Sequence, residues 1–186
     1  MPLRNTAEAY GSLAKFLHWA IVLLILPQYF LADIADELPK GSPRASELFG
    51  LHKSIGLLVF ILALVRIGWK FTHRTNPAPL GEVIWQRKAA TAGHVILYVL
   101  ILLQPLSGWA MASASGHPIR FFGWVTFPSL VGKNDALHEV LEAAHKTLFY
   151  VLLVVAVLHV TAAIYHHRVL KDDTLRRMLP FSRRPA

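Results

Sequence analysis

Two histidines stand 14 residues apart in an otherwise apolar run, HKTLFYVLLVVAVLH, which covers residues 145–159. On an α-helix, 14 residues advance about 21 Å and complete nearly four turns. His145 and His159 therefore lie near one face of such a helix but at opposite depths of a bilayer. Because a polar ring inside a membrane is costly, it usually faces the interior of a helix bundle and serves a function.

The composition of the chain is that of a membrane protein. Of its 186 residues, 54% are hydrophobic, and the mean hydropathy is +0.44. A membrane-spanning helix needs about 20 apolar residues, and four segments meet this length, at about 13–35, 48–71, 89–112 and 143–167. The sequence therefore predicts an all-α, integral membrane four-helix bundle that forms a single domain over residues 1–186.

The distribution of charge predicts the orientation of this bundle. Lys and Arg gather in the loop between the second and third spans and in the tail 168–186, whereas the first loop carries four acidic residues against two basic ones. The positive-inside rule then assigns both termini to the cytoplasm. The net charge of +8 indicates contact with anionic membrane lipid. Nucleic-acid binding is not expected, because the basic residues flank the spans instead of forming a folded patch.

Prolines interrupt two of the predicted spans. Pro27 and Pro105 are each expected to kink a helix. Gln104, Ser107 and Gly108 cluster around the second of these positions. We interpret this cluster as close helix packing through small residues.

The predicted topology sorts the histidines of the spans into two layers. Helices one and three run outward, and helices two and four run back, so that residues early in helix two meet residues early in helix four. The outer layer contains His52 and His145. The inner layer, with its margin, contains His18, His94, His159 and His166.

Imidazoles that face each other at two depths are typical of two six-coordinate haems. Because the chain has no cysteine, covalent c-type attachment is excluded and the haem would be b-type. Gly56, one turn after His52, would leave room for a porphyrin face. Spacing alone does not decide whether His18 or His94 pairs with His159.

Two other interpretations of the histidines remain at this point. Each ring could simply form hydrogen bonds within the bundle. A zinc site is the other alternative, but catalytic zinc usually has three protein ligands, often with a carboxylate, and no acidic residue lies in the central part of any span.

Four segments of the chain resemble a known family. They are FLHWAIVLLIL, GLHKSIGLLVFILALVRI, AGHVILYVLILLQPLSG and the tail KDDTLRRMLP after a pair of histidines. The fourth segment extends upstream of this tail and reads AAHKTLFYVLLVVAVLHVTAAIYHHRVLKDDTLRRMLP in full, with the tail as its most specific part. Together the four segments cover nearly the whole chain and resemble the bacterial di-haem cytochrome b561 family, multi-pass proteins of the inner membrane. The resemblance implies that His18 and His159 bind a cytoplasm-side haem b and that His52 and His145 bind a periplasm-side haem b. It also implies a ubiquinone pocket beside the inner haem that uses the remaining pair, His94 and His166.

The same resemblance extends to an activity. Superoxide oxidases of this family pass electrons from periplasmic superoxide to ubiquinone, so we expect a superoxide:quinone oxidoreductase. Lys53 and Lys146 directly follow the outer histidines and could attract an anion or neutralise haem propionates. The alternative is a cytochrome b anchor that passes electrons to quinone from a hydrogenase or dehydrogenase partner subunit.

Overall fold

The computed structural model describes residues 3–7, 9–72 and 83–180, and most of them are helical. The five longest helices are α1 (Ser12–Ile25), α2 (Gln28–Glu37), α3 (Pro43–Thr72), α4 (Ile84–Ala114) and α5 (Asp135–Tyr165). A short hairpin, β1 (Arg120–Phe121) and β2 (Val125–Thr126), joins α4 to α5. A π-helical turn η1 (His166–Leu170) and a short helix α6 (Thr174–Met178) follow α5.

Four helical segments of the described chain are long and apolar enough to span a membrane, with α1 and α2 counted as one. The predicted membrane bundle is therefore confirmed. The helices continue beyond the predicted spans, because hydropathy reports the apolar centre of a helix and not its polar ends. Helix α5, for example, starts at Asp135, where the side chain of Asn134 accepts a hydrogen bond of 3.0 Å from the backbone of Leu137, a typical N-cap.

The two prolines inside the spans act differently. Pro27 separates α1 from α2, as a residue without a backbone N–H is expected to do. Pro105 instead lies inside the continuous helix α4. A membrane helix can contain such a proline without a break, because neighbouring helices and side chains satisfy the backbone groups that the proline leaves without a partner.

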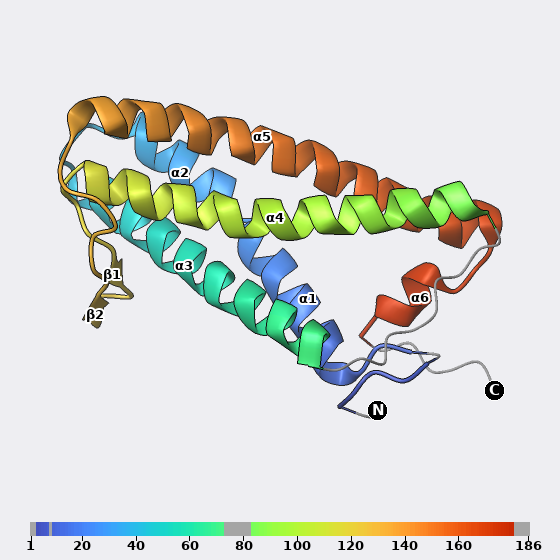
Figure 1. The fold of residues 1–186 in the computed structure, drawn as a ribbon. Coiled ribbons are helices and arrows are strands. Elements are labelled where there is room, and N and C mark those ends of the chain that lie inside the picture. The colour runs from blue at the N-terminus through green and yellow to red at the C-terminus, as the bar shows by residue number, and fades with distance from the viewer. Residues whose placement is uncertain (1–2, 8, 73–82, 181–186) are drawn as a thin grey trace.

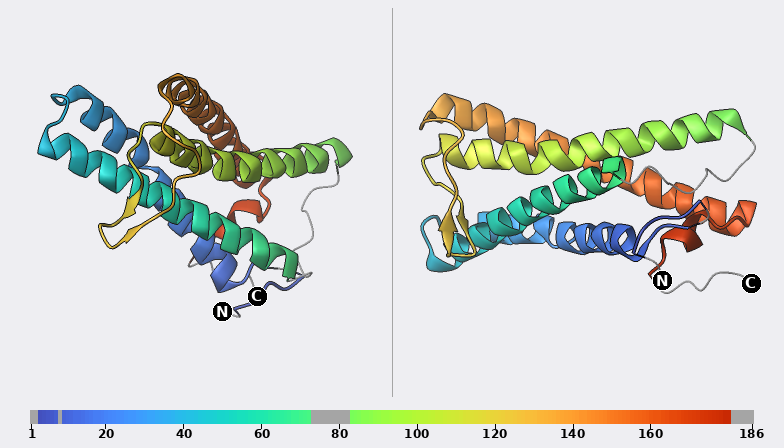
Figure 2. Two further views of the ribbon diagram at one scale, coloured as in Figure 1. Left: turned by 60° about the vertical axis from the view of Figure 1, so that its left-hand side comes forward. Right: turned by 60° about the horizontal axis from the view of Figure 1, so that its bottom comes forward.

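The helices form two groups that lie against each other. Helix α3 packs on α1, α2 and α4, and α5 runs along α4. Figure 2 shows α1, α2 and α3 on one side and the α4–α5 pair on the other. The N-terminal segment, the end of α3, the start of α4 and α6 all lie at one end of the molecule (Figure 1). This is the end that the charge distribution assigns to the cytoplasm.

Two buried serines fasten the hairpin and its loop over the outer end of the bundle. The hydroxyl of Ser54 on α3 donates to the carbonyl of Gly50 and accepts a bond of 3.0 Å from the backbone of Phe122. The hydroxyl of Ser113 on α4 likewise accepts a bond of 3.0 Å from the backbone of Leu130. The sequence did not predict this ordered cap, which covers the outer end of α3 and α4.

The C-terminal segment folds back onto the inner end of α1. The ammonium of Lys15 donates to the carbonyl of Leu179 at 3.0 Å, and the indole N–H of Trp19 donates to the carbonyl of Met178 at 2.8 Å. The reversal begins at Lys171, whose φ of 54° ends the π-helical turn in a left-handed conformation. The end of helix α6 therefore lies against Lys15 and Trp19 at the inner end of α1.

Candidate functional site

The outer layer brings His52 of α3 and His145 of α5 together. Their ring centres are 6.3 Å apart, and the ring planes are inclined by 78°. The two residues come from opposite sides of the bundle, since α3 belongs to one helix group and α5 to the other. The predicted outer pair is thus assembled as one site.

Hydrogen bonds fix the orientation of both outer rings. Nδ1 of His52 lies 3.0 Å from the backbone carbonyl of Gln28. A carbonyl can only accept, so this Nδ1 carries the hydrogen and Nε2 is left with its lone pair. The contact couples the ring to α2, the outer half of the first span, and it is the kind of partner that orients metal-binding histidines.

His145 is held in the same way by a side chain of α4. The hydroxyl of Ser107 donates to the carbonyl of Gln104 at 2.8 Å, so its oxygen accepts the hydrogen of Nδ1 of His145 at 2.9 Å. Nε2 of His145 again keeps its lone pair, and the side-chain amide of Gln104 donates to it at 3.2 Å. A metal ion at Nε2 would replace that last bond.

Gly108 completes the support for His145. A Cβ atom at this position would lie 3.0 Å from Cε1 of His145 and 3.4 Å from its Nδ1, so only glycine lets the ring lie this close to α4. Our interpretation of Gln104, Ser107 and Gly108 as a packing cluster was incomplete, because the partner that they pack against is His145. Their positions at i, i+3 and i+4 place them on one helix face, which is a signal that the sequence did contain.

The inner layer places His159 of α5 between two histidines. Its ring centre lies 6.4 Å from that of His18 on α1 and 5.3 Å from that of His94 on α4. Arg66 of α3 is a charged neighbour of all three rings, and its guanidinium donates to the carbonyl of Ala14 at 2.6 Å. All three predicted inner histidines are therefore brought together.

The spacing of the rings fits two imidazoles on opposite sides of one iron ion. An imidazole nitrogen lies about 2 Å from a bound first-row metal, and the half-widths of the two rings bring their centres to roughly 6 Å apart. The separations of 6.3 Å at the outer pair and 6.4 Å between His18 and His159 match this value. The 5.3 Å between His94 and His159 is shorter, which favours His18 as the inner partner.

Polar groups and open space near the outer pair also fit a bound cofactor. Within the described residues, the side-chain amide of Gln28 and the side-chain carbonyl of Gln104 are buried without a partner. Both glutamines contact the outer histidines through other atoms. A Cβ on Gly56, one turn after His52, would meet no atom within 4 Å, so this position leaves the room that the sequence predicted.

His166 lies at the inner margin, where it pairs with a carboxylate. Its Nδ1 donates to Asp172 at 2.6 Å, and the backbone N–H of Thr174 donates to the same carboxylate at 2.9 Å. Burial opposes ionisation of Asp172, but these hydrogen bonds outweigh it and lower its pKa. In the part of the chain that the structure describes, no hydrogen bond or ring contact joins His166 to His94.

The two lysines that follow the outer histidines have different surroundings. The ammonium of Lys146 is exposed and forms an ion pair of 2.6 Å with Glu142. Lys53 is half-buried beside His52, and no acidic group pairs with it among the described residues. Lys53 is therefore the less neutralised of the two cations near the outer pair.

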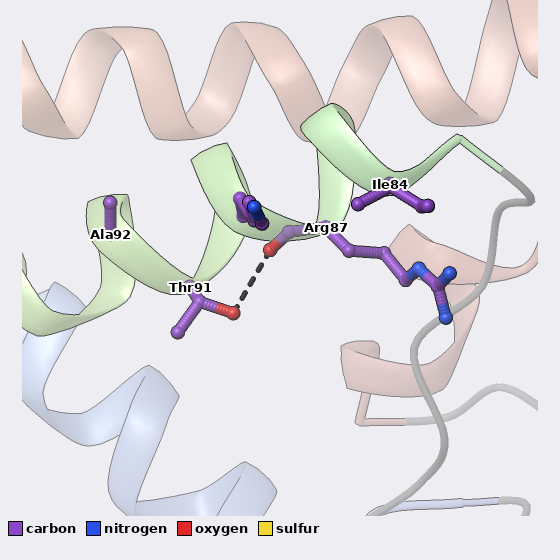
Figure 3. A pocket seen from close by; sticks show the side chains of 5 residues that line it. Ile84, Arg87, Thr91 and Ala92 are labelled. Atoms are coloured by element: carbon purple, nitrogen blue, oxygen red, sulfur yellow. Dashed lines mark hydrogen bonds between the residues drawn. The ribbon is translucent and has the colours of Figure 1, made fainter.

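A separate concavity lies at the inner end of α4. Ile84, Arg87, Lys88, Thr91 and Ala92 line it (Figure 3). The hydroxyl of Thr91 donates to the carbonyl of Arg87, one turn earlier on the same helix, at 2.9 Å. None of the predicted histidine ligands lines this surface, so it is distinct from the two histidine sites.

Comparison with known proteins gives one consistent result. A family model for prokaryotic cytochrome b561 matches residues 9–181. Cytochrome b561 homolog 2 of Escherichia coli (strain K12) is 33% identical over 96% of this chain and 95% of its own. Cytochrome b561 homolog 1 of the same strain is 30% identical over 89% of this chain and 93% of its own. A protein of Yersinia pestis, "Probable superoxide oxidase CybB", is 31% identical over 95% of this chain and 98% of its own.

Proposed function

The chain belongs to the prokaryotic cytochrome b561 family, and from that premise we propose that it holds two haem b groups and transfers electrons from periplasmic superoxide to ubiquinone. Membership makes it a haem b electron-transfer protein of the bacterial inner membrane. The observation that carries the proposal beyond this is the presence of two imidazole pairs at two depths of α5, with ring separations of 6.3 and 6.4 Å. When bound, the two haems would supply one-electron transfer across the membrane.

At the outer site, the residues of this chain would bind the cofactor and attract the donor. His52 and His145 would hold the haem iron through their Nε2 atoms, because each Nε2 keeps its lone pair. At His145 the iron would replace the hydrogen bond from Gln104. The half-buried ammonium of Lys53, which pairs with no acidic group among the described residues, would provide local attraction for a small anion. The Yersinia pestis relative, whose name describes a probable superoxide oxidase, supports superoxide as that anion.

At the inner site, His18 and His159 would hold the second haem, and the quinone would bind beside them. The net reaction takes one electron from each of two superoxide anions, which become two oxygen molecules. One ubiquinone accepts both electrons and two protons and becomes ubiquinol. His94 and His166 would hydrogen-bond the quinone carbonyls and supply protons. The carboxylate of Asp172, which accepts from Nδ1 of His166, would keep that ring oriented.

The purified full-length protein tests this proposal by anaerobic stopped flow. Superoxide should reduce the haems rapidly, and added ubiquinone should reoxidise them, with one ubiquinol formed for every two superoxide anions consumed. His117→Ala is a suitable control, since His117 is exposed and its ring forms a hydrogen bond only with Ser115 among the described residues. This variant should keep the wild-type rates.

Two results would contradict the proposal in different ways. Haems that superoxide leaves oxidised, in a protein that co-purifies with a soluble redox subunit able to reduce them, would identify a membrane anchor. A dithionite-reduced sample with the absorbance of a single haem would remove the two-site arrangement itself.

A further inference from the structure

The two histidine pairs differ in how their rings are held. Both outer rings donate from Nδ1, His52 to the carbonyl of Gln28 at 3.0 Å and His145 to the hydroxyl of Ser107 at 2.9 Å. Neither His18 nor His159 has a ring hydrogen bond to another described residue. Each pair has a cation nearby, Lys53 outside and Arg66 inside, so the presence of a charge does not distinguish the sites.

A hydrogen bond at Nδ1 changes the electron donation of the opposite nitrogen. When the Nδ1 hydrogen is drawn towards an acceptor, the ring gains negative character and Nε2 becomes a stronger donor to its metal. Ferric iron carries one more positive charge than ferrous iron, so it gains more from a stronger donor. Hydrogen-bonded axial histidines therefore lower the reduction potential of a haem.

We propose that the hydrogen bonds to the outer histidines hold the outer haem at a lower reduction potential than the inner one. Ser107 of α4 is the positioning residue, because it accepts the hydrogen bond from His145. This inference rests on the two-haem arrangement of the proposed function. Transfer of one electron from the outer ferrous haem to the inner ferric haem is then downhill. The asymmetry directs electrons inward, whatever reduces the outer site.

Ser107 can act in this way because both of its hydrogen-bonding roles are fixed. Its single hydrogen goes to the carbonyl of Gln104, so its oxygen can only accept from the ring. Gly108, one residue later, allows the ring to come this close to α4. Ser107→Ala removes the acceptor and leaves the ligand itself in place.

The size of the effect follows from known outer-shell substitutions. Loss of such a partner typically weakens metal binding by 10–100-fold. If Ser107→Ala weakens the preference for ferric over ferrous iron by about tenfold, the outer midpoint rises by about 59 mV. The inner midpoint potential should stay unchanged, because among the described residues no hydrogen bond joins Ser107 to His18 or His159.

Potentiometric titration of the purified, haem-loaded protein tests the inference. In the wild type, the wave of lower potential should be the one that His145→Ala or His52→Ala removes. Ser107→Ala should raise the midpoint potential of that wave by an amount that corresponds to about a tenfold change in the reduction equilibrium. Ser107→Thr, which keeps a hydroxyl, should have the wild-type midpoint potential. Thr147→Val is the matched control, because among the described residues the Thr147 hydroxyl bonds only the carbonyl of Ala143 on its own helix, at 2.8 Å.

Even if Ser107→Ala loses its outer haem, the proposal can be tested in the wild type by comparing the midpoint potentials of the two haems. An outer wave at the higher potential would overturn it. So would an outer wave that is unchanged in Ser107→Ala while the ferric spectrum remains that of bis-histidine haem. These outcomes are separate from the donor, since the potentials are measured without superoxide or quinone.

Discussion

One added methyl group at Gly108 should affect helix stability and cofactor binding in opposite directions. In Gly108→Ala, the new Cβ would lie 3.0 Å from Cε1 of His145. Carbon atoms pack best at about 3.5–4.0 Å, so the ring would have to retreat by about 0.5 Å. The same change favours helix α4, because alanine exceeds glycine in helix stability by about 0.5–1 kcal/mol.

The two effects act on different observables. Retreat of the ring stretches the 2.9 Å hydrogen bond between His145 and Ser107. A hydrogen bond of this kind contributes about 0.5–1.5 kcal/mol net, which corresponds to a roughly 2- to 12-fold weaker hold on the outer haem. The free energy of unfolding should change by less than about 1 kcal/mol, because the helix gain offsets the lost bond.

Haem titration of the purified variant, combined with its thermal unfolding in detergent, measures both quantities. Gly50→Ala is the control, since Gly50 is an exposed helical residue at the outer end of α3 and its added Cβ would meet no atom within 4 Å. It should gain helix stability and keep both haems. The reasoning is refuted if Gly108→Ala binds the outer haem as tightly as the wild type, or if both variants lose haem equally.

Three further predictions concern the two ends of the electron path and the C-terminal tail. Lys53→Gln should slow haem reduction by superoxide more than Lys146→Gln does, because the ammonium of Lys146 is already paired with Glu142. The wild-type rate should fall as the Debye length shrinks from about 30 Å at 0.01 M salt to about 3 Å at 1 M. A salt-independent rate would exclude attraction by charge. His94→Ala and His166→Ala should leave both haem spectra unchanged but slow reoxidation by a ubiquinone analogue in stopped flow; loss of the inner-haem signal in His94→Ala would make His94 the ligand. The lowered pKa of Asp172 means that its carboxylate stabilises the folded tail at neutral pH and that this stabilisation is lost as the pH falls through that pKa. Limited proteolysis of the tail should therefore increase in acid for the wild type and be high at every pH for Asp172→Asn, and equal cleavage of the two proteins at pH 7 would exclude this role.

The helical core of the fold could be predicted from the sequence because a bilayer imposes one strong constraint. Apolar runs of about 20 residues leave few alternatives to a spanning helix. The helix ends could not be predicted, because they depend on individual polar contacts such as the cap of α5 by Asn134. The hairpin depends on Ser54 and Ser113, which accept backbone hydrogen bonds from residues far away in the sequence.

The histidine layers could also be predicted, because antiparallel helices of known direction fix the depth of each residue. The sequence alone left the partner of His159 open, since His18 and His94 lie at similar depth. The ring separations of 6.4 and 5.3 Å favour His18, which stays a proposal. The pair of His166 with Asp172 was missed because the turn between them combines a π-helix with a left-handed residue, Lys171, and the sequence showed no signal for that geometry.

The count of haems per chain in single histidine variants tests the central claim most directly. The wild type should contain two haem b groups per chain, each with the spectrum of bis-histidine ligation. His52→Ala and His145→Ala should each lose the same haem, and His18→Ala and His159→Ala should each disturb the other one. The account is contradicted if the wild type holds a single haem, or if any of these four variants retains two fully six-coordinate haems.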